Sequence, residues 1–119
     1  MGFRLNNSII RDPDGRVKFK RLKEGGYDHY HVGVWLEADE ERDLERVEWV
    51  DYELHPSFQN RIRTSHNRVN DFSITFWSWG TFRVHAKVHL AGAETVTIEY
   101  ELDYDLPADT GSNYVQVSG

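Results

Sequence analysis

Strict alternation of apolar and polar residues marks two neighbouring segments in the C-terminal half of the chain. In residues 82–90 every second residue from Phe82 to Leu90 is apolar, and the positions between them carry Arg, His and Lys. Residues 95–104 repeat the pattern, with Thr, Glu and Asp at the polar positions. A period of two residues predicts a β-strand with one buried face. The short connection "AGAE" predicts that the two strands form an antiparallel hairpin.

Related patterns predict three further strands upstream. Residues 29–37 alternate and follow the turn-forming pair Gly25-Gly26. In residues 46–54 the alternation changes phase, which predicts a β-bulge near Trp49. The short apolar segment 72–76 is expected to be the third strand.

The segments between these strands predict turns and loops. The sequence "DPDGR" at 12–16 is a strong turn signal, and we expect it to join an N-terminal hairpin whose outer face is cationic. Residues 37–47 are short and highly charged, so they need form no more than one helical turn. Residues 59–71 are polar and basic without periodicity, and we expect a long loop there. The tail from residue 109 is expected to be frayed or a weak edge strand.

Several short strands separated by turns, without a long helix, indicate an all-β protein. We predict an immunoglobulin-like antiparallel β-sandwich of about seven or eight strands. This domain is expected to cover residues 1–108, with residues 109–119 as a weakly ordered tail. A chain of 119 residues is long enough for one core without covalent staples.

Composition narrows the function. The chain has no cysteine, which excludes disulfides, thiolate nucleophiles and cysteine-ligated zinc. Its formal net charge of −6 lacks the excess of cations typical of a nucleic-acid binder and favours a basic partner. Neither a signal peptide nor a membrane-spanning apolar run is visible. We therefore expect a soluble, cytoplasmic protein, or a nuclear one if its source is eukaryotic.

Two short stretches carry aromatic side chains where turns are expected. "LHPSF" at 54–58 places Phe58 after a predicted strand, and "FWSWGTF" at 76–82 places Trp79 beside Gly80. If both loops leave the same end of the sandwich, the two rings can form the walls of a slot for a flat ligand. Ser57 can supply the hydrogen bond that a planar amide loses on leaving water, and His55 can orient its hydroxyl.

The order of these motifs resembles that of a YEATS domain, a reader of acylated lysine in histone tails. The resemblance runs from about residue 17 to about residue 106 and rests on five stretches. These are "LHPSF", the basic loop, Phe72 with "SWGTF", "RVHAKVHL" and "ETVTIEYELDYDL". It implies an immunoglobulin-type sandwich that holds the acyl-lysine side chain between two loop aromatics.

The resemblance also implies roles for particular residues. Phe58 and Trp79 match the two aromatic walls, Ser57 would hydrogen-bond the acyl amide with support from His55, and the backbone around Trp79 and Gly80 would complete the grip. A neutral amide enters such a slot at little cost, whereas a free ammonium would lose its hydration there. The predicted ligand-binding residues are His55, Ser57, Phe58, Ser78, Trp79 and Gly80, with Phe72 and Trp77 as accessory positions.

Three positions depart from the family's pattern. The chain has "VND" where the family usually has a proline pair before the aromatic matched by Phe72, Ser78 where it has a glycine, and Thr81 where an acidic residue is common. These departures indicate a divergent, prokaryotic-type branch, whose domains resemble sensor modules and whose ligands need not be histones.

Other interpretations of the same residues stay open at this point. Phe58 can fold back over the core, and Trp79 can be an ordinary cross-strand packing partner. Ser57 and His55 lack an orienting acid and a nucleophile elbow, so hydrolysis is not expected. The histidine pairs on two strands lack a third convergent ligand, and we predict no metal site and no cofactor.

Function is therefore predicted in one main form with two alternatives. The main form is a non-enzymatic module that binds an acylated-lysine peptide or protein, with no membrane or nucleic-acid partner and a monomer favoured. The alternatives are a structural or sensor sandwich that uses its aromatics for a protein interface, and carbohydrate binding through Trp77 and Trp79. A slot of facing rings favours the first function, a flat apolar patch the second and a coplanar row of rings the third.

Overall fold

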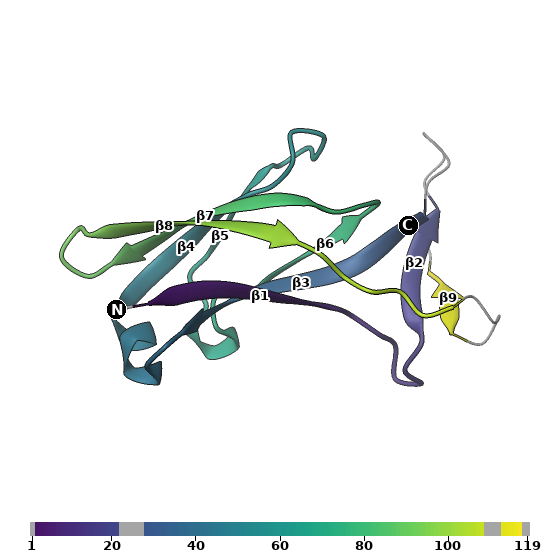
Figure 1. Cartoon of the computed structure of the whole chain (residues 1–119), viewed down its shortest axis with the longest axis horizontal. Helices are drawn as coiled ribbons and strands as arrows, with labels where there is room; N and C mark the ends of the chain where they lie inside the picture. Colours follow the sequence, from purple (N-terminus) through teal and green to yellow (C-terminus); the bar gives the residue numbers. More distant parts are fainter. Residues whose placement is uncertain (1, 22–27, 109–112, 118–119) are drawn as a thin grey trace.

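The computed structural model describes residues 2–21, 28–108 and 113–117 of the chain. These residues form nine β-strands and two short 3-10 helices (Figure 1). Neither of these helices is long or apolar enough to cross a membrane. In chain order the elements are β1 (Phe3–Ile9), β2 (Val17–Arg21), β3 (Asp28–Ala38), η1 (Glu41–Arg46), β4 (Val47–Glu53), β5 (Ile62–Ser65), η2 (Arg68–Asn70), β6 (Ile74–Ser78), β7 (Phe82–Leu90), β8 (Thr95–Leu102) and β9 (Tyr114–Gln116).

The strands form two layers. The first sheet contains β1, β2, β3, β6 and β9, and the second has the order β5-β4-β7-β8. Within β3, Tyr30 pairs with residues of both β2 and β6, and Val32 pairs with residues of both β1 and β6. Because a strand has two edges, β6 occupies one edge of β3, and β1 followed by β2 occupies the other. Apart from the parallel pair β2–β9, the named strand pairs are antiparallel.

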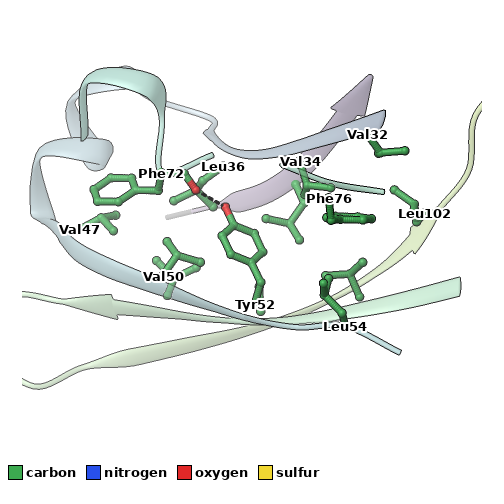
Figure 2. Close-up of a cluster of buried hydrophobic side chains, with 14 of the residues drawn as sticks. Val32, Val34, Leu36, Val47, Val50, Tyr52, Leu54, Phe72, Phe76 and Leu102 are labelled. Atoms are coloured by element: carbon green, nitrogen blue, oxygen red, sulfur yellow. Dashed lines mark hydrogen bonds between the residues drawn. The ribbon is translucent and has the colours of Figure 1, made fainter. Parts of the chain in front are cut away.

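The core lies between the two sheets and follows from the alternation in the sequence. Alternate residues of β7 from Val84 to Leu90 are buried, and β3 and β4 contribute a further set that includes Tyr52 (Figure 2). The Tyr52 hydroxyl donates a hydrogen bond of 2.6 Å to the backbone oxygen of Phe72. Burial raises the pKa of Tyr52, so this hydroxyl stays protonated and remains a donor. The bond ties the second sheet to the chain that leads into β6.

Most of the predicted strands are confirmed. Residues 29–37, 46–54, 82–90 and 95–104 correspond to β3, β4, β7 and β8, and the last two form the predicted hairpin. The register between β4 and β7 shifts between Val47 and Trp49, as the change of phase predicted. The immunoglobulin-like β-sandwich is likewise confirmed. The charged segment 37–47 contains η1, a short 3-10 helix.

The prediction of a long loop at 59–71 is wrong. This segment contains β5, which pairs with β4, and the short helix η2. The strand predicted at 72–76 begins two residues later, at Ile74, because Asp71 and Phe72 adopt left-handed backbone angles with φ of 58° and 56°. A residue with positive φ cannot continue an extended strand.

The N-terminal hairpin is much shorter than predicted. The "DPDGR" turn is present, but within residues 2–21 the two arms pair with each other only at the bridge between Arg11 and Val17, since β1 and β2 both pair with β3. The predicted turn at Gly25-Gly26 lies outside the described residues. In the tail, β9 pairs with β2, as expected of an edge strand. The domain boundary at residue 108 stays a prediction.

Candidate functional site

Two connections meet at one end of the sandwich. The β4–β5 connection stands at the top of Figure 1 with the β6–β7 turn to its right, and the β7–β8 hairpin lies at the opposite end. The first connection opens with a turn in which the backbone nitrogen of Phe58 donates to the His55 carbonyl oxygen at 3.0 Å. Pro56 is the second residue of this turn, where its fixed φ is favourable. The turn therefore presents His55 and Ser57 at the surface.

The side chains of His55 and Ser57 form a hydrogen-bonded pair. The Ser57 backbone N–H donates to His55 Nδ1 at 3.1 Å, and Ser57 Oγ lies 2.8 Å from the same nitrogen. A nitrogen that accepts the N–H carries no proton in the neutral ring, so the hydroxyl donates to it as well. The oxygen of Ser57 then keeps lone pairs that can accept a hydrogen bond from a ligand amide N–H.

Phe58 is half-buried and packs against the end of the core. Its ring centroid lies 5.6 Å from that of Phe76 and 5.4 Å from that of Phe82. The Phe76 and Phe82 rings lie 5.9 Å apart, so the three phenyl groups form one cluster. This packing agrees with the interpretation of Phe58 as a loop aromatic folded over the core. Phe58 therefore contributes to the edge of the core, and we expect its removal to lower stability.

Trp79 is half-exposed, at 50%. β6 ends at Ser78, whose hydroxyl donates to the Gly80 carbonyl at 2.5 Å and accepts from the Gly80 N–H at 3.3 Å. The buried Ser78 side chain therefore holds the turn that carries Trp79, and it positions the indole. The indole lies 6.3 Å from the His55 ring in an edge arrangement.

Phe82 links the two loops. Its ring lies 6.1 Å from the His55 ring in addition to its contact with Phe58, so His55 contacts both Phe82 and Trp79. The tertiary structure thus places His55, Ser57, Phe58 and Trp79 at the same end of the sandwich, with Phe58 and Trp79 linked through Phe82 and His55. The predicted slot between the two rings stays a prediction. Phe82 lies on the inward face of its strand, as the alternation predicts, and its contact with His55 is an addition from the structure. Its position directly after the "WGT" turn was the signal available in the sequence.

The two accessory residues lie elsewhere. Phe72 is 1% exposed and packs beside Val47, at the opposite end of the core from Leu54, which directly precedes His55 (Figure 2). Trp77 points away from the core on the outer face of the first sheet. Its ring stacks on that of His31 at 4.4 Å, and Lys20 Nζ lies 4.4 Å from a ring centroid of the same indole. Neither residue joins the cluster around Trp79.

The packing of His31 against Trp77 leads us to predict how the stability of the protein depends on pH. Burial, followed by the charges of Lys18 and Lys20, lowers the pKa of His31. Below the usual histidine pKa of about 6.5 the unfolded chain takes up a proton that the folded protein resists, so stability falls as the pH drops through this value. We expect the Tm to fall between about pH 7.5 and pH 5.5, and to fall less in His31→Phe, which keeps a stacking ring that does not titrate. Equal pH dependence in both proteins would contradict this.

These features define a class of protein: an immunoglobulin-like β-sandwich with an aromatic loop site at one end. A family model described as the prokaryotic YEATS domain matches residues 30–103. The chain therefore belongs to the prokaryotic YEATS domain family, and the resemblance seen in the sequence is confirmed. No curated protein matches the chain significantly.

Solved structures of the yeast protein Yaf9 share the fold. The Yaf9 YEATS domain recognizing an H3K122suc peptide is 13% identical with a TM-score of 0.57, over 85% of this chain and 69% of that one. The Yaf9 YEATS domain bound to H3K27ac is 15% identical with a TM-score of 0.58, over 91% and 73% of the two chains. At these identities the likeness shows the fold alone.

Proposed function

We propose that the protein is a non-enzymatic recognition module that binds acylated lysine, of acetyl or crotonyl type, in a peptide or protein. The observation that carries this proposal is the half-exposed Trp79 beside the surface pair of His55 and Ser57. Trp79 supplies an aromatic face and Ser57 supplies a hydrogen-bond acceptor, and a planar amide requires both of these features. Relatives of the same fold bind acylated histone peptides, in line with this proposal.

The chemistry of the site favours the acylated side chain over free lysine. The acyl amide is neutral and flat, so its face stacks on Trp79 while its N–H donates to Ser57 Oγ. A lysine ammonium would lose hydration on entering the same space. Phe58 and Phe82 lie at the same end of the sandwich, and we propose that together with Trp79 they enclose the acyl chain. A longer planar chain covers more of this surface and binds more tightly.

The direct test is titration of matched peptides that differ only at one lysine. Peptides with crotonyl-lysine and acetyl-lysine should bind, the crotonyl form more tightly, and the unmodified peptide should bind weakly or not at all. Calorimetric titration measures each dissociation constant. Equal affinity for all the forms would show that the aromatic cluster serves the fold without reading acylation.

Ser57 provides a narrower test of the hydrogen bond. We expect Ser57→Ala to weaken binding of the acetyl-lysine peptide by about 1 kcal/mol or somewhat more, because the amide N–H loses its acceptor. Stability should change by less than about 0.5 kcal/mol, since Ser57 is exposed. Ser73→Ala, directly before β6 and away from the loop, is the matched control and should leave the affinity unchanged. Full affinity in Ser57→Ala would remove this residue from the proposed site.

A further inference from the structure

A groove on the outer face of the second sheet leads to the proposed acyl-lysine site. One hollow of about 400 Å³ is bordered by both strands β4 and β7 and by the first turn of the β4–β5 connection. Its lining is Glu53, Leu54, His55, Pro56, Arg61, Arg83 and His85. A second hollow, of about 200 Å³, is lined by Asp51, Tyr52, Glu53, Ile62 and Lys87. Glu53 borders both hollows, so they lie next to each other along β4, and we call the pair the groove.

The charges along this groove are unevenly satisfied. Arg83 donates to Glu101 at 2.6 Å and lies 3.6 Å from Glu99, so its charge is already matched. Arg61 forms no ion pair with any residue that the structure describes, and neither does Lys87 or Glu53. The groove therefore has a cation without an ion pair, Arg61, beside the loop, and Glu53 in its middle. At its far end Lys87 lies on the strand position opposite Asp51, whose carboxylate also contacts His89.

Arg61 is placed for contact with a ligand that enters the proposed site. Its carbonyl accepts a hydrogen bond of 2.7 Å from the Leu54 N–H, which fixes its backbone beside the residue that precedes His55. Its side chain is exposed. The next residue, Ile62, is 52% exposed and adds an apolar surface to the groove. A peptide whose acyl-lysine lies at Trp79 and Ser57 can thus extend along β4 past Arg61.

We propose that this groove binds the peptide segment next to the acyl-lysine and that Arg61 selects an acidic side chain there. The inference rests on the proposed function, because it uses the acyl-lysine site to anchor the peptide. Because of this local cation, the groove is expected to prefer an acidic peptide, whereas the net charge of −6 by itself favours a basic partner. Further along the groove a peptide carboxylate would meet the carboxylates of both Glu53 and Asp51, which restricts the preference to the Arg61 end.

The test uses four forms of one peptide, which combine crotonyl-lysine or lysine with glutamate or glutamine at a neighbouring position. An extended chain spans ~3.3–3.6 Å per residue, so the glutamate is moved through the positions within about four residues of the lysine. Each peptide is titrated against the wild type, Arg61→Gln and Arg42→Gln. Arg42 is an exposed arginine of η1, at the other end of β4, and is the matched control.

We expect glutamate at one position to tighten binding of the crotonyl peptide by about two- to fivefold at low salt, with a smaller effect at high salt. The gain should disappear in Arg61→Gln and persist in Arg42→Gln. Acyl-dependent binding without a glutamate preference would overturn the inference and leave the proposed function intact. A glutamate preference that needs Arg61 but not the acyl group would support the groove and overturn the acyl-lysine function. The assignment to Arg61 would be overturned if neither the acyl group nor the glutamate changed the affinity of the wild type. It would also be overturned if the glutamate preference persisted in Arg61→Gln.

Discussion

Trp79→Ala should weaken binding of a crotonyl-lysine peptide by about 1 to 3 kcal/mol, which is roughly 5- to 150-fold in the dissociation constant. The indole is half-exposed at the end of β6 and supplies the accessible aromatic face of the proposed site. Its removal should change the free energy of unfolding by much less than its effect on binding, because so much of the ring faces solvent. Calorimetric titration and urea unfolding of the same protein measure the two effects separately.

Trp77→Ala is the matched control for this experiment. It removes the same side chain two residues earlier, but from the outer face of the first sheet, where the ring contacts His31 and Lys20. Affinity for the acylated peptide should be unchanged, while stability falls with the loss of the stacked pair. Should Trp77→Ala reduce the affinity as much as Trp79→Ala does, the ligand would lie across the sheet and the loop site would be the wrong location. Trp79→Phe should retain part of the affinity, since a phenyl face remains.

Phe72→Ala should lower the free energy of unfolding by about 3 to 5 kcal/mol. The ring is buried in the core, and alanine in its place would leave a cavity beside Val47 (Figure 2). Phenylalanine and alanine at position 72 both have to adopt the left-handed backbone conformation with φ 56°. The difference in the free energy of unfolding therefore reports mainly the loss of the ring. Urea unfolding measures the change. The folded fraction should bind the acylated peptide with nearly wild-type affinity, because distant sites act independently.

This variant separates the core role of Phe72 from the accessory site role suggested by the sequence. Reduced affinity at unchanged stability would return Phe72 to the binding site. Phe72→Leu keeps most of the buried volume and provides a folded protein for titration if the alanine variant is too unstable. Val69→Ala, in the neighbouring helix η2, removes a side chain that is 95% exposed and should change neither quantity.

Variants of Phe58 require measurement of both the peptide affinity and the free energy of unfolding. Its ring packs against Phe76 and Phe82, so a substitution changes the edge of the core together with any wall of the proposed site. A loss of affinity in Phe58→Ala is therefore interpretable only beside its loss of stability. Trp79, which lies further into solvent, gives the cleaner measurement.

Features that depend on residues close together in the chain could be predicted from the sequence. Period-two alternation predicted β7 and β8 and their hairpin, because a half-buried strand must place apolar side chains on one face. A change of phase located the bulge near Trp49 for the same reason. The motifs "LHPSF" and "SWGTF" indicated the family, and their turn residues predicted the loops that meet at the site.

Features that depend on partners distant in the chain could not be predicted in this way and are seen in the folded structure. The short segment Ile62–Ser65 has no clear pattern of its own and becomes a strand because β4 supplies its hydrogen bonds. Phe72 leaves the predicted strand because its left-handed backbone places the ring in the core and its carbonyl within reach of Tyr52. Two tryptophans separated by one residue diverge because β6 ends between them, so that Trp77 stays with the sheet and Trp79 joins His55. Local alternation indicates which face of a strand a residue occupies, but it does not indicate where the strand ends. Because β6 ends at Ser78, Trp79 lies in the loop site.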